Sequence, residues 1–178
     1  MMKTTQQRFR EAIRNVPDFP KPGINFKDIT PVFQVPELVR DVVSELASQY
    51  KTANIEGIAG IESRGFLIGV PLALALNVPF ILIRKRGKLP YETVSHKYHL
   101  EYGTAEIEMH IDAVEPDQNI LIHDDLLATG GSAAAAAELI ISQKASVVGF
   151  DFLIELDFLN GREQLVKYSK NISNFVTY

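Results

Sequence analysis

The sequence predicts an α/β fold, in which a mostly parallel central sheet is flanked by helices. Two observations predict it: short apolar runs of strand length recur along the chain, and segments of helical character separate several of them. Such alternation is typical of parallel sheets whose faces are covered by helices. With 178 residues, of which 46% are hydrophobic and 22% charged, the chain is long enough for one sizeable core. We therefore expect a single domain over residues 1–178.

Two helices are predicted in the first third of the chain. Residues 4–15 suit the first helix, which Pro17 and the prolines after it would stop, leaving an irregular stretch to about Pro31. Pro36 can begin the second helix, because apolar residues recur at helical spacing between residues 38 and 46. The apolar face of this second helix is expected to point toward the core.

A further helix and four strands are predicted in the rest of the chain. Residues 131–143 predict a helix, because alanine fills residues 133–137 and has the highest helix propensity. Ligands of such sheets bind beyond the carboxyl ends of the strands, so the residues after each strand are the candidates for a site. The predicted strands are Gly57–Ile61, Pro79–Arg84, Asn119–His123 and Val147–Ile154.

The nearly uncharged stretch Phe66–Ile83 approaches the length of roughly 18 residues that indicates a membrane span. Pro71, Asn77 and Pro79 interrupt it, and charged residues crowd both ends, so a buried helix followed by a buried strand is the better explanation. The first ten residues are polar and charged, unlike a secretory signal. We therefore expect neither export nor a membrane partner.

Charge and cysteine content exclude several classes of function. A formal net charge of −4 gives no general attraction to nucleic acid or anionic membranes. The absence of cysteine excludes disulfides, thiolate zinc sites and cysteine nucleophiles. A local basic cluster at residues 84–88 is either a solvated turn or part of an anion site.

The strongest functional signal follows the predicted strand at residues 119–123. Asp124 and Asp125 come first, then Thr-Gly-Gly-Ser at residues 129–132, and the alanine-rich helix begins directly afterwards. Glycines let the backbone approach an anion, and hydroxyls and helix-start amides can donate to it. The adjacent carboxylates can accept hydrogen bonds from a ribose diol or hold magnesium through water. An acidic turn alone would have no function, but the order of these features favours a sugar phosphate site.

A second anion cradle is predicted at residues 62–65, which follow another strand and open a helix. Arg64 adds a guanidinium that suits a diphosphate. The alternative is a helix start in which Glu62 and Arg64 are only surface charges. Phe66 stands where a Walker A loop needs lysine, and no GxGxxG follows a strand, which argues against ATPases and dinucleotide enzymes.

Further motifs extend over nearly the whole chain. They are Asp18–Gly23, Phe26–Pro31, Gly60–Phe66, Arg84–Pro90, Leu100–Gly103 and Gly161–Glu163. Residues 120–132 resemble the phosphoribosyl pyrophosphate signature of type I phosphoribosyltransferases, and the other motifs resemble the adenine-specific branch of that family. The resemblance implies the fold of the family, with an N-terminal hood over about residues 1–34 and a mobile loop at residues 85–100 that closes over the substrates.

The resemblance also implies an activity and a setting. The reaction would be Mg²⁺-dependent transfer of the phosphoribosyl group from phosphoribosyl pyrophosphate to adenine, giving AMP and pyrophosphate in purine salvage. The enzyme would be a cytoplasmic homodimer. A displacement at the anomeric carbon through an oxocarbenium-like transition state needs no covalent enzyme intermediate.

Individual roles follow from the resemblance. Glu101 would handle the proton on adenine N7, which requires a closed, desolvated site to raise the pKa of a carboxyl from about 4.3. Arg64 would lie close to both pyrophosphate and purine, and would act in catalysis with Glu101. Asp124 and Asp125 would meet the ribose hydroxyls or hold Mg²⁺ through water, with no direct protein ligand to the metal. The other positions are Ala128, Thr129, Gly130, Gly131 and Ser132 for the 5-phosphate, Glu62, Ser63, Arg64, Gly65, Lys85 and Lys88 for pyrophosphate, and Ile24, Asn25, Phe26 and Lys27 for adenine.

The chain departs from the family pattern at several positions. His123 replaces an apolar residue, and it is either a partner of the acidic pair or, as we favour, a hydrogen-bonded and partly buried side chain. Ser132 replaces threonine but keeps the hydroxyl. Asn25 stands where an apolar residue is common, Lys27 where arginine is common, and Tyr91 where a small residue is common.

Two other functions remain open. A phosphoribosyltransferase for another purine or a pyrimidine would share the phosphate sites, although residues 100–103 and the hood segments favour adenine. A non-catalytic sensor of phosphoribosyl pyrophosphate that regulates transcription would need an added DNA-binding segment. We expect no room for such a segment and no nucleic-acid partner.

Overall fold

The computed structural model describes residues 2–100 and 103–178 and divides the chain into two compact units. The units are Met1–Gln49 and Tyr50–Tyr178, and each is described by itself. The first unit contains the expected hood, about residues 1–34, together with most of the helix that follows it. The second unit contains both predicted anion loops.

The first unit begins with helix α1, Thr5–Ala12. Thr4 and Gln7 form a reciprocal capping box, in which each side chain accepts from the other residue's amide. The helix was expected to reach residue 15 but ends earlier, because the chain turns extended at Ile13. The remaining elements of this unit are β1 Arg14–Pro17, β2 Asn25–Asp28, the 3-10 helix η1 Thr30–Gln34 and α2 Pro36–Tyr50.

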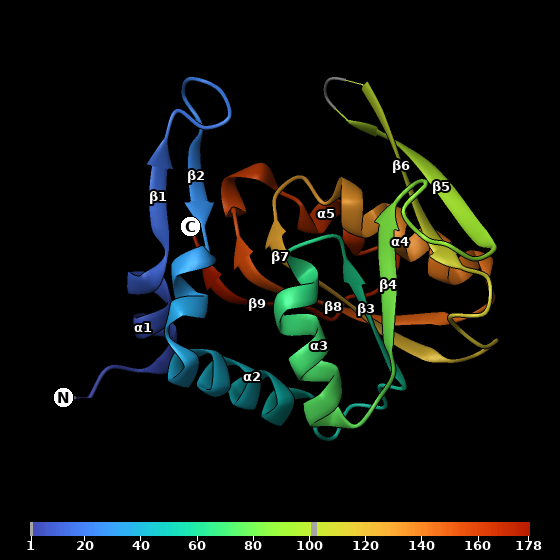
Figure 1. Cartoon of the computed structure of the whole chain (residues 1–178), viewed down its shortest axis with the longest axis horizontal. Helices are drawn as coiled ribbons and strands as arrows, with labels where there is room; N and C mark the ends of the chain where they lie inside the picture. The colour runs from blue at the N-terminus through green and yellow to red at the C-terminus, as the bar shows by residue number, and fades with distance from the viewer. Residues whose placement is uncertain (1, 101–102) are drawn as a thin grey trace. The chain divides into compact units, whose positions relative to one another are not determined.

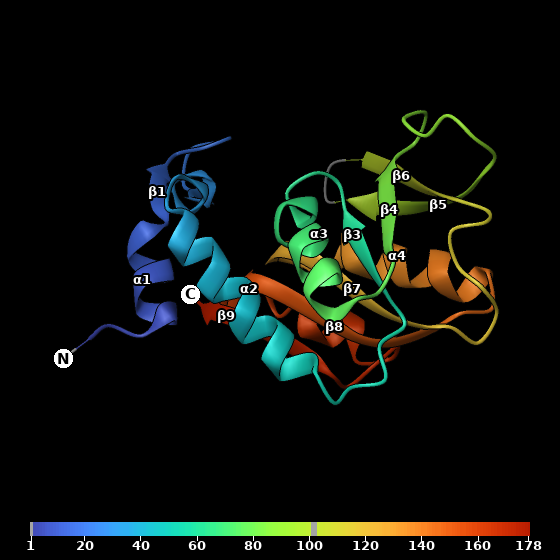
Figure 2. The same ribbon diagram turned by 60° about the horizontal axis from the view of Figure 1, so that its bottom comes forward.

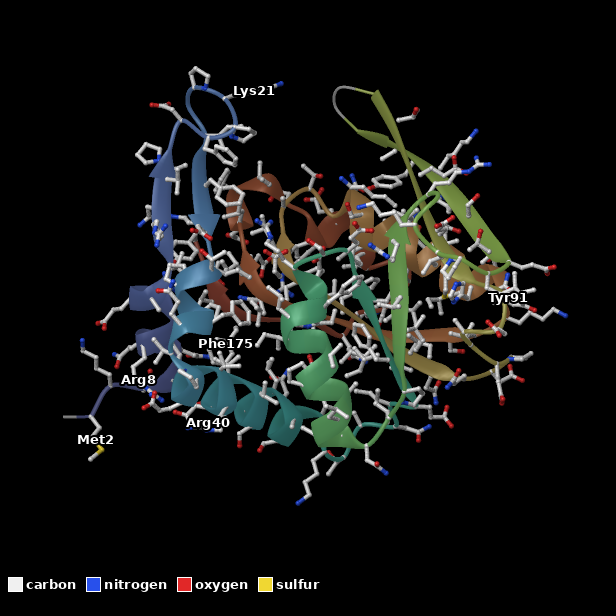
Figure 3. The ribbon with its side chains drawn as sticks, viewed as in Figure 1. Met2, Arg8, Lys21, Arg40, Tyr91 and Phe175 are labelled. Atoms are coloured by element: carbon white, nitrogen blue, oxygen red, sulfur yellow. The ribbon has the colours of Figure 1, made fainter. Side chains whose placement is uncertain are left out.

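A small hairpin occupies part of the stretch that was expected to be irregular. β1 and β2 pair antiparallel, with Val16 opposite Phe26. Lys21 lies at the tip of the loop that joins them (Figure 3). The side chains of Arg8 and Asp41 form an ion pair that joins α1 to α2. The predicted helix from Pro36 is confirmed, and its residues Leu38, Val42 and Leu46 are buried.

In the described residues of the second unit, seven strands form one sheet in the order β5-β6-β4-β3-β7-β8-β9 (Figure 1). The pairs of β3 with β4, β3 with β7, β7 with β8 and β8 with β9 are parallel, whereas β6 runs antiparallel to β4 and β5. The predicted α/β fold with a mostly parallel sheet is confirmed. The strands are β3 Gly57–Ile61, β4 Phe80–Lys85, β5 Thr93–Leu100, β6 Gly103–His110, β7 Asn119–Leu127, β8 Ser146–Glu155 and β9 Ile172–Thr177.

Helices cover both faces of this sheet (Figures 1 and 2). α3, Gly65–Leu76, lies on one face, and α4, Gly131–Ser142, lies on the other. The alanines of α4 are small enough to bring the helix close to Ile120 and Ile122, with which they form the main core. Two short helices complete the unit: η2 Asp157–Leu159 and α5 Arg162–Leu165.

One expectation about the second unit is corrected and another is confirmed. The segment from Lys85 to Leu100 was expected to be more like a mobile loop than a core element, but residues 93–100 form β5, which pairs along its length with β6. The apolar stretch Phe66–Ile83 was expected to be a helix followed by a strand, and α3 and β4 confirm this; α3 continues through Pro71 and ends before Asn77, which has a left-handed φ of 57°. None of the helices described is long and apolar enough to cross a membrane.

Candidate active site

The two predicted anion loops leave neighbouring strands of the sheet. β3 and β7 are parallel, with Gly60 opposite His123, so the loops that follow them leave the same edge. The helix after β3 covers one face and the helix after β7 covers the other (Figure 2). This is the topological switch point at which open α/β sheets bind ligands. The fold therefore brings together two loops that lie far apart in the sequence.

The acidic pair lies in β7 itself. The strand was expected to end at His123, but its pairing with β8 continues to Leu127. Asp125 is buried, and Asp124 keeps some exposed surface, but its Oδ1 lies against the start of α3, 3.0 Å from where a Cβ at Gly65 would stand. The amide of Asp125 donates to Asp124 Oδ1 over 2.8 Å. Because the carboxylates belong to a paired strand, their positions are set by the sheet and not by a loose turn.

Arg64 connects the two loops. It lies at the start of α3, and its Nε is 2.7 Å from Asp125 Oδ2, with the Asp125 side chain only 6% exposed. Burial raises the pKa of Asp124 well above its usual range, and the charge of Asp125 adds to this rise. Burial also raises the pKa of Asp125, while the guanidinium of Arg64 opposes the rise. The site thus holds two carboxyl groups whose ionised forms would be stabilised by hydroxyl donors or by a further cation.

The glycine-rich loop follows directly. Gly130 has φ +83°, a left-handed conformation that glycine adopts without strain, and α4 begins at the next residue. The amides of the first turn of a helix have no carbonyl partner within the helix and point outward. The Thr129 side chain is exposed, and Ser132 Oγ lies 3.2 Å from the hydroxyl of Tyr98. The loop from Ala128 to Ser132 therefore has the donors that the phosphate prediction requires.

Gly161 packs closely against the residues that lead into this loop. A Cβ at Gly161 would lie 2.2 Å from the carbonyl oxygen of Ala128 and 2.8 Å from Leu127 Cδ1. The next residue, Arg162, is fixed in turn, because it donates to both carboxylate oxygens of the buried Glu155, over 2.6 and 2.7 Å. The contact explains why the Gly-Arg-Glu segment belongs with the site.

Glu62 faces the basic turn after β4. Its carboxylate accepts from Arg84 Nε over 3.2 Å and from the amide of Lys85 over 3.1 Å, and it also binds the ammonium of Lys88. Burial alone would raise its pKa, but these hydrogen bonds outweigh burial and lower it. Glu62 therefore lies among cations, and its contacts order the turn that carries Lys85 and Lys88.

The two predicted lysines differ in their surroundings. Lys88 binds Glu62, and its amide donates to the buried Glu108 over 2.9 Å. The ammonium of Lys85 is exposed and has no ion-pair partner in the described part of the chain. Tyr91, at the end of this turn, is 58% exposed and meets the ring of His110 edge-on (Figure 3).

The adenine candidates lie in and beside β2 of the first unit. Ile24 is 44% exposed, and Phe26 packs edge-on against Phe19 with ring centroids 5.2 Å apart. Lys27 Nζ donates to Asn15 Oδ1 over 2.6 Å. Asn25 is exposed. Glu101 lies outside the described residues, so its role stays a prediction.

His123 is a fully buried side chain with a partner of its own. Its Nδ1 lies 2.7 Å from Asp151 Oδ2, and neither side chain is exposed. The hydroxyl of Tyr50 donates to the other oxygen of Asp151 over 2.8 Å and contacts Ser173. The favoured expectation of a hydrogen-bonded histidine is confirmed at Nδ1, but the burial is complete, and Nε2 has no hydrogen-bond partner among the described residues. Asp151 carried no signal of its own, but a histidine and an aspartate in two apolar strands could have indicated the pair.

Sequence reasoning also missed residues beyond the polar motifs. Tyr98 of β5 contacts the glycine-rich loop through Ser132. Phe158 and Leu159, which follow β8, are 71% and 38% exposed. Exposed apolar residues just after a parallel strand were the available signal for a contact with an apolar ligand.

Comparison with known proteins identifies the family. Residues 31–176 match the phosphoribosyl transferase domain. An adenine phosphoribosyltransferase of Cytophaga hutchinsonii is 47% identical over 97% of this chain and 96% of its own. The crystal structure of adenine phosphoribosyltransferase from Thermoanaerobacter pseudethanolicus superposes with a TM-score of 0.93, at 45% identity over 97% of this chain and 99% of its own. The Saccharomyces cerevisiae enzyme, solved with an imino-altritol bisphosphate and adenine, gives a TM-score of 0.90 at 39% identity, over 97% and 98% of the two chains.

The chain therefore belongs to the phosphoribosyltransferase family. Its whole-length relatives place it in the adenine phosphoribosyltransferase branch of that family.

Proposed function

We propose that this protein transfers the phosphoribosyl group of phosphoribosyl pyrophosphate to N9 of adenine, giving AMP and pyrophosphate in purine salvage. The single observation that carries the proposal is the connection of Arg64 to Asp125, which joins a diphosphate loop and a sugar phosphate loop at the switch point of the sheet. A substrate with phosphate groups at both ends of a ribose fits such a pair of loops.

The sugar phosphate end would lie over β7 and α4. The amides and hydroxyls of residues 128–132 would hold the 5-phosphate, and Asp124 and Asp125 would accept from the ribose hydroxyls. Each hydrogen bond to a charged group contributes roughly 1.5–3 kcal/mol. Several such bonds are sufficient to fix the anomeric carbon relative to the second loop.

The diphosphate end would lie at the start of α3. The backbone of residues 62–65 and the side chain of Arg64 would hold it, with Lys85 and Lys88 adding positive charge. Glu62 would contribute through the order it gives to the basic turn. As the bond from the anomeric carbon to pyrophosphate breaks, these cations would stabilise the charge that develops on the leaving group.

The base would be held by the hood residues 24–27, with Glu101 handling the proton on N7. The exposed apolar surface of Phe158 and Leu159 at the carboxyl edge of β8 can pack against a planar ring. The hairpin of β5 and β6 would help to keep water from the oxocarbenium-like transition state.

Magnesium fits this donor set as a partly hydrated ion. Within residues 2–100 and 103–178, no three acidic or histidine side chains gather closely enough to hold a metal. Mg²⁺ commonly binds through one or two carboxylates, water and substrate phosphates. Asp124 and Asp125 would hold it through water, and when bound it would neutralise charge on pyrophosphate.

A homodimer and a cytoplasmic location complete the proposal. On α3, Leu67, Val70 and Leu74 are 44%, 40% and 77% exposed at helical spacing, which is the kind of surface that another subunit covers. Sedimentation that shows only monomer at working concentrations would contradict the dimer.

Phosphorylated substrates are retained inside cells, which supports the proposed cytoplasmic location.

The test is formation of AMP from adenine and phosphoribosyl pyrophosphate, with and without Mg²⁺, in the presence of hypoxanthine, guanine and uracil as competitors. Turnover of adenine alone, and only with Mg²⁺, is the expected result. Turnover of another base would contradict the adenine assignment but keep the phosphate sites. Binding of phosphoribosyl pyrophosphate without turnover would favour a sensor.

Gly161→Ala is expected to weaken binding of phosphoribosyl pyrophosphate. Its Cβ would overlap the Ala128 carbonyl, so the phosphate loop must move. Overpacking typically costs about 1–3 kcal/mol of stability, and a displacement near 1 Å in a site can lower activity by about 10²-fold. Titration calorimetry and thermal unfolding measure the two effects. Glu163→Ala, at an exposed neighbour, is the control, and equal binding by both variants would contradict the supporting role of Gly161.

A further inference from the structure

Tyr98 touches the phosphate loop from a different part of the chain. It lies in β5, opposite Ala105 of β6, and its ring is partly buried against the core that α4 shares with the sheet. Its hydroxyl is 3.2 Å from Ser132 Oγ at the first turn of α4. An added Cβ at Gly131 would lie 3.9 Å from Cδ2 of Tyr98, so the ring stands beside the open side of this glycine.

We propose that Tyr98 is a positioning residue for the 5-phosphate, acting through the Ser132 hydroxyl, and that it links occupation of the phosphate loop to the hairpin of β5 and β6. The proposal rests on the proposed function, because it takes the ligand of Ser132 to be a phosphate. The residue would not touch the substrate itself.

The argument depends on how hydroxyl groups share hydrogen bonds. A serine hydroxyl has one hydrogen to donate and two lone pairs to accept with. If Ser132 donates to a phosphate oxygen, Tyr98 can donate to Ser132 Oγ at the same time. A chain of this kind strengthens both bonds, because each donation polarises the next. The tyrosine hydroxyl would thus hold the serine in the rotamer that faces the phosphate.

The same contact has a consequence for the hairpin. β5 runs from Thr93 to Leu100, so Tyr98 lies on the strand that leads directly to Glu101 in the sequence. A bond between Tyr98 and Ser132 that strengthens when phosphate binds would restrain this strand. Phosphate binding at one end of the substrate would then restrict the segment that is expected to cover the other end.

Tyr98→Phe tests the proposal, because phenylalanine keeps the packed ring and removes only the hydroxyl. We expect the KM and the Kd for phosphoribosyl pyrophosphate to rise about 3- to 10-fold, as for loss of one hydrogen bond, with the KM for adenine unchanged. In a Ser132→Ala background the same substitution should add nothing, whereas in a Ser132→Thr background, which keeps the hydroxyl, the effect should persist. Equal losses in the alanine and serine backgrounds would contradict action through Ser132.

The matched control is Tyr168→Phe. Tyr168 packs against the same core, but its hydroxyl donates to Glu138, over 2.5 Å, and not to the loop. This variant should leave both KM values unchanged. If it reproduces the loss, the effect of Tyr98 is general to buried tyrosines and the proposal is wrong.

Hydrogen exchange gives the readout for the hairpin. Saturating ribose 5-phosphate should slow exchange of the β5 amides in the parent protein more than in Tyr98→Phe, and equal protection would contradict the link.

The Kd for ribose 5-phosphate, measured by calorimetry, needs no turnover. A parent protein that forms no AMP would therefore contradict the proposed function, while the binding data would still decide the role of Tyr98.

Discussion

Asp124→Asn is expected to lower kcat/KM for phosphoribosyl pyrophosphate by about 10²-fold while making the unliganded protein more stable at neutral pH. The loss follows from the proposed contact with the ribose, since one hydrogen bond to a charged group contributes up to roughly 3 kcal/mol. The gain follows from burial, which makes an ionised carboxylate at this position unfavourable until a ligand binds. Function and stability would thus change in opposite directions, as is common at binding sites.

The stability gain should depend on pH in a defined direction. Burial raises the pKa of Asp124 in the folded protein above that of the unfolded chain, so the folded state holds the proton more tightly. The stabilising contribution of the protonated carboxyl is present at low pH and is lost as the pH rises through the folded-state pKa. Asparagine cannot ionise, so the advantage of the variant should grow as the pH rises from about 4 toward the folded-state pKa of Asp124, and then stay constant.

Urea unfolding in buffer with EDTA, at several pH values, measures this difference. Asp112→Asn, which removes one carboxyl group at an exposed position, is the control. A gap for Asp124→Asn that is constant throughout or that shrinks with rising pH would show that burial does not govern the carboxyl.

Asp151→Ala is expected to lower the free energy of unfolding by about 3–5 kcal/mol, because it removes the shared partner of a buried histidine and a buried tyrosine. His123 and Asp151 have no exposed surface, and Tyr50 donates to the same carboxylate. Burial and the nearby charge of Asp151 both raise the pKa of Tyr50, so its hydroxyl stays a donor throughout the accessible pH range. Without Asp151, His123 Nδ1 would lose its partner in the core, and Tyr50 would keep only its contact with Ser173.

Thermal unfolding measures the loss, which corresponds to roughly 2–4 °C in Tm for each kcal/mol in a chain of this size. Asp112→Ala is the matched control and should stay within about 0.5 kcal/mol of the parent. Asp151→Asn, which keeps an acceptor oxygen, should lose less than alanine. A loss below about 1 kcal/mol for alanine would mean that the network adds little to the fold.

Elements with one clear apolar pattern could be predicted from the sequence. The helix from Pro36, the alanine-rich helix and the strand at Gly57–Ile61 all appear at or near the expected residues, because local periodicity and propensity agree with burial. β5 was not predicted, because polar and charged residues stand between its core-packed residues Val94 and Tyr98, and its order comes from pairing with β6. β9 was missed for a related reason: it is an edge strand that pairs only with β8 among the described strands.

The sequence predicted which loops form the candidate site, but it did not predict the side-chain contacts between them. The order of strand, acidic pair, glycines and helix is local, so it locates the glycine-rich loop between β7 and α4. The bond from Arg64 to Asp125 depends on β3 and β7 being neighbours, which no local pattern reports. The position of Glu62 among cations likewise depends on the turn after β4.

The pairing of β3 with β7 also sets the distance between the two predicted anion loops. Parallel neighbours lie about 4.8 Å apart, and the hydrogen bonds around Gly60 and His123 prevent one strand from sliding along the other. The two anion loops are therefore held at a separation that side-chain motion cannot change. A ligand with a single phosphate would fill only one loop, and one with a longer spacer between its phosphates would reach past the second. The sheet itself would select substrates by the distance between their charged ends before any side chain reads the base.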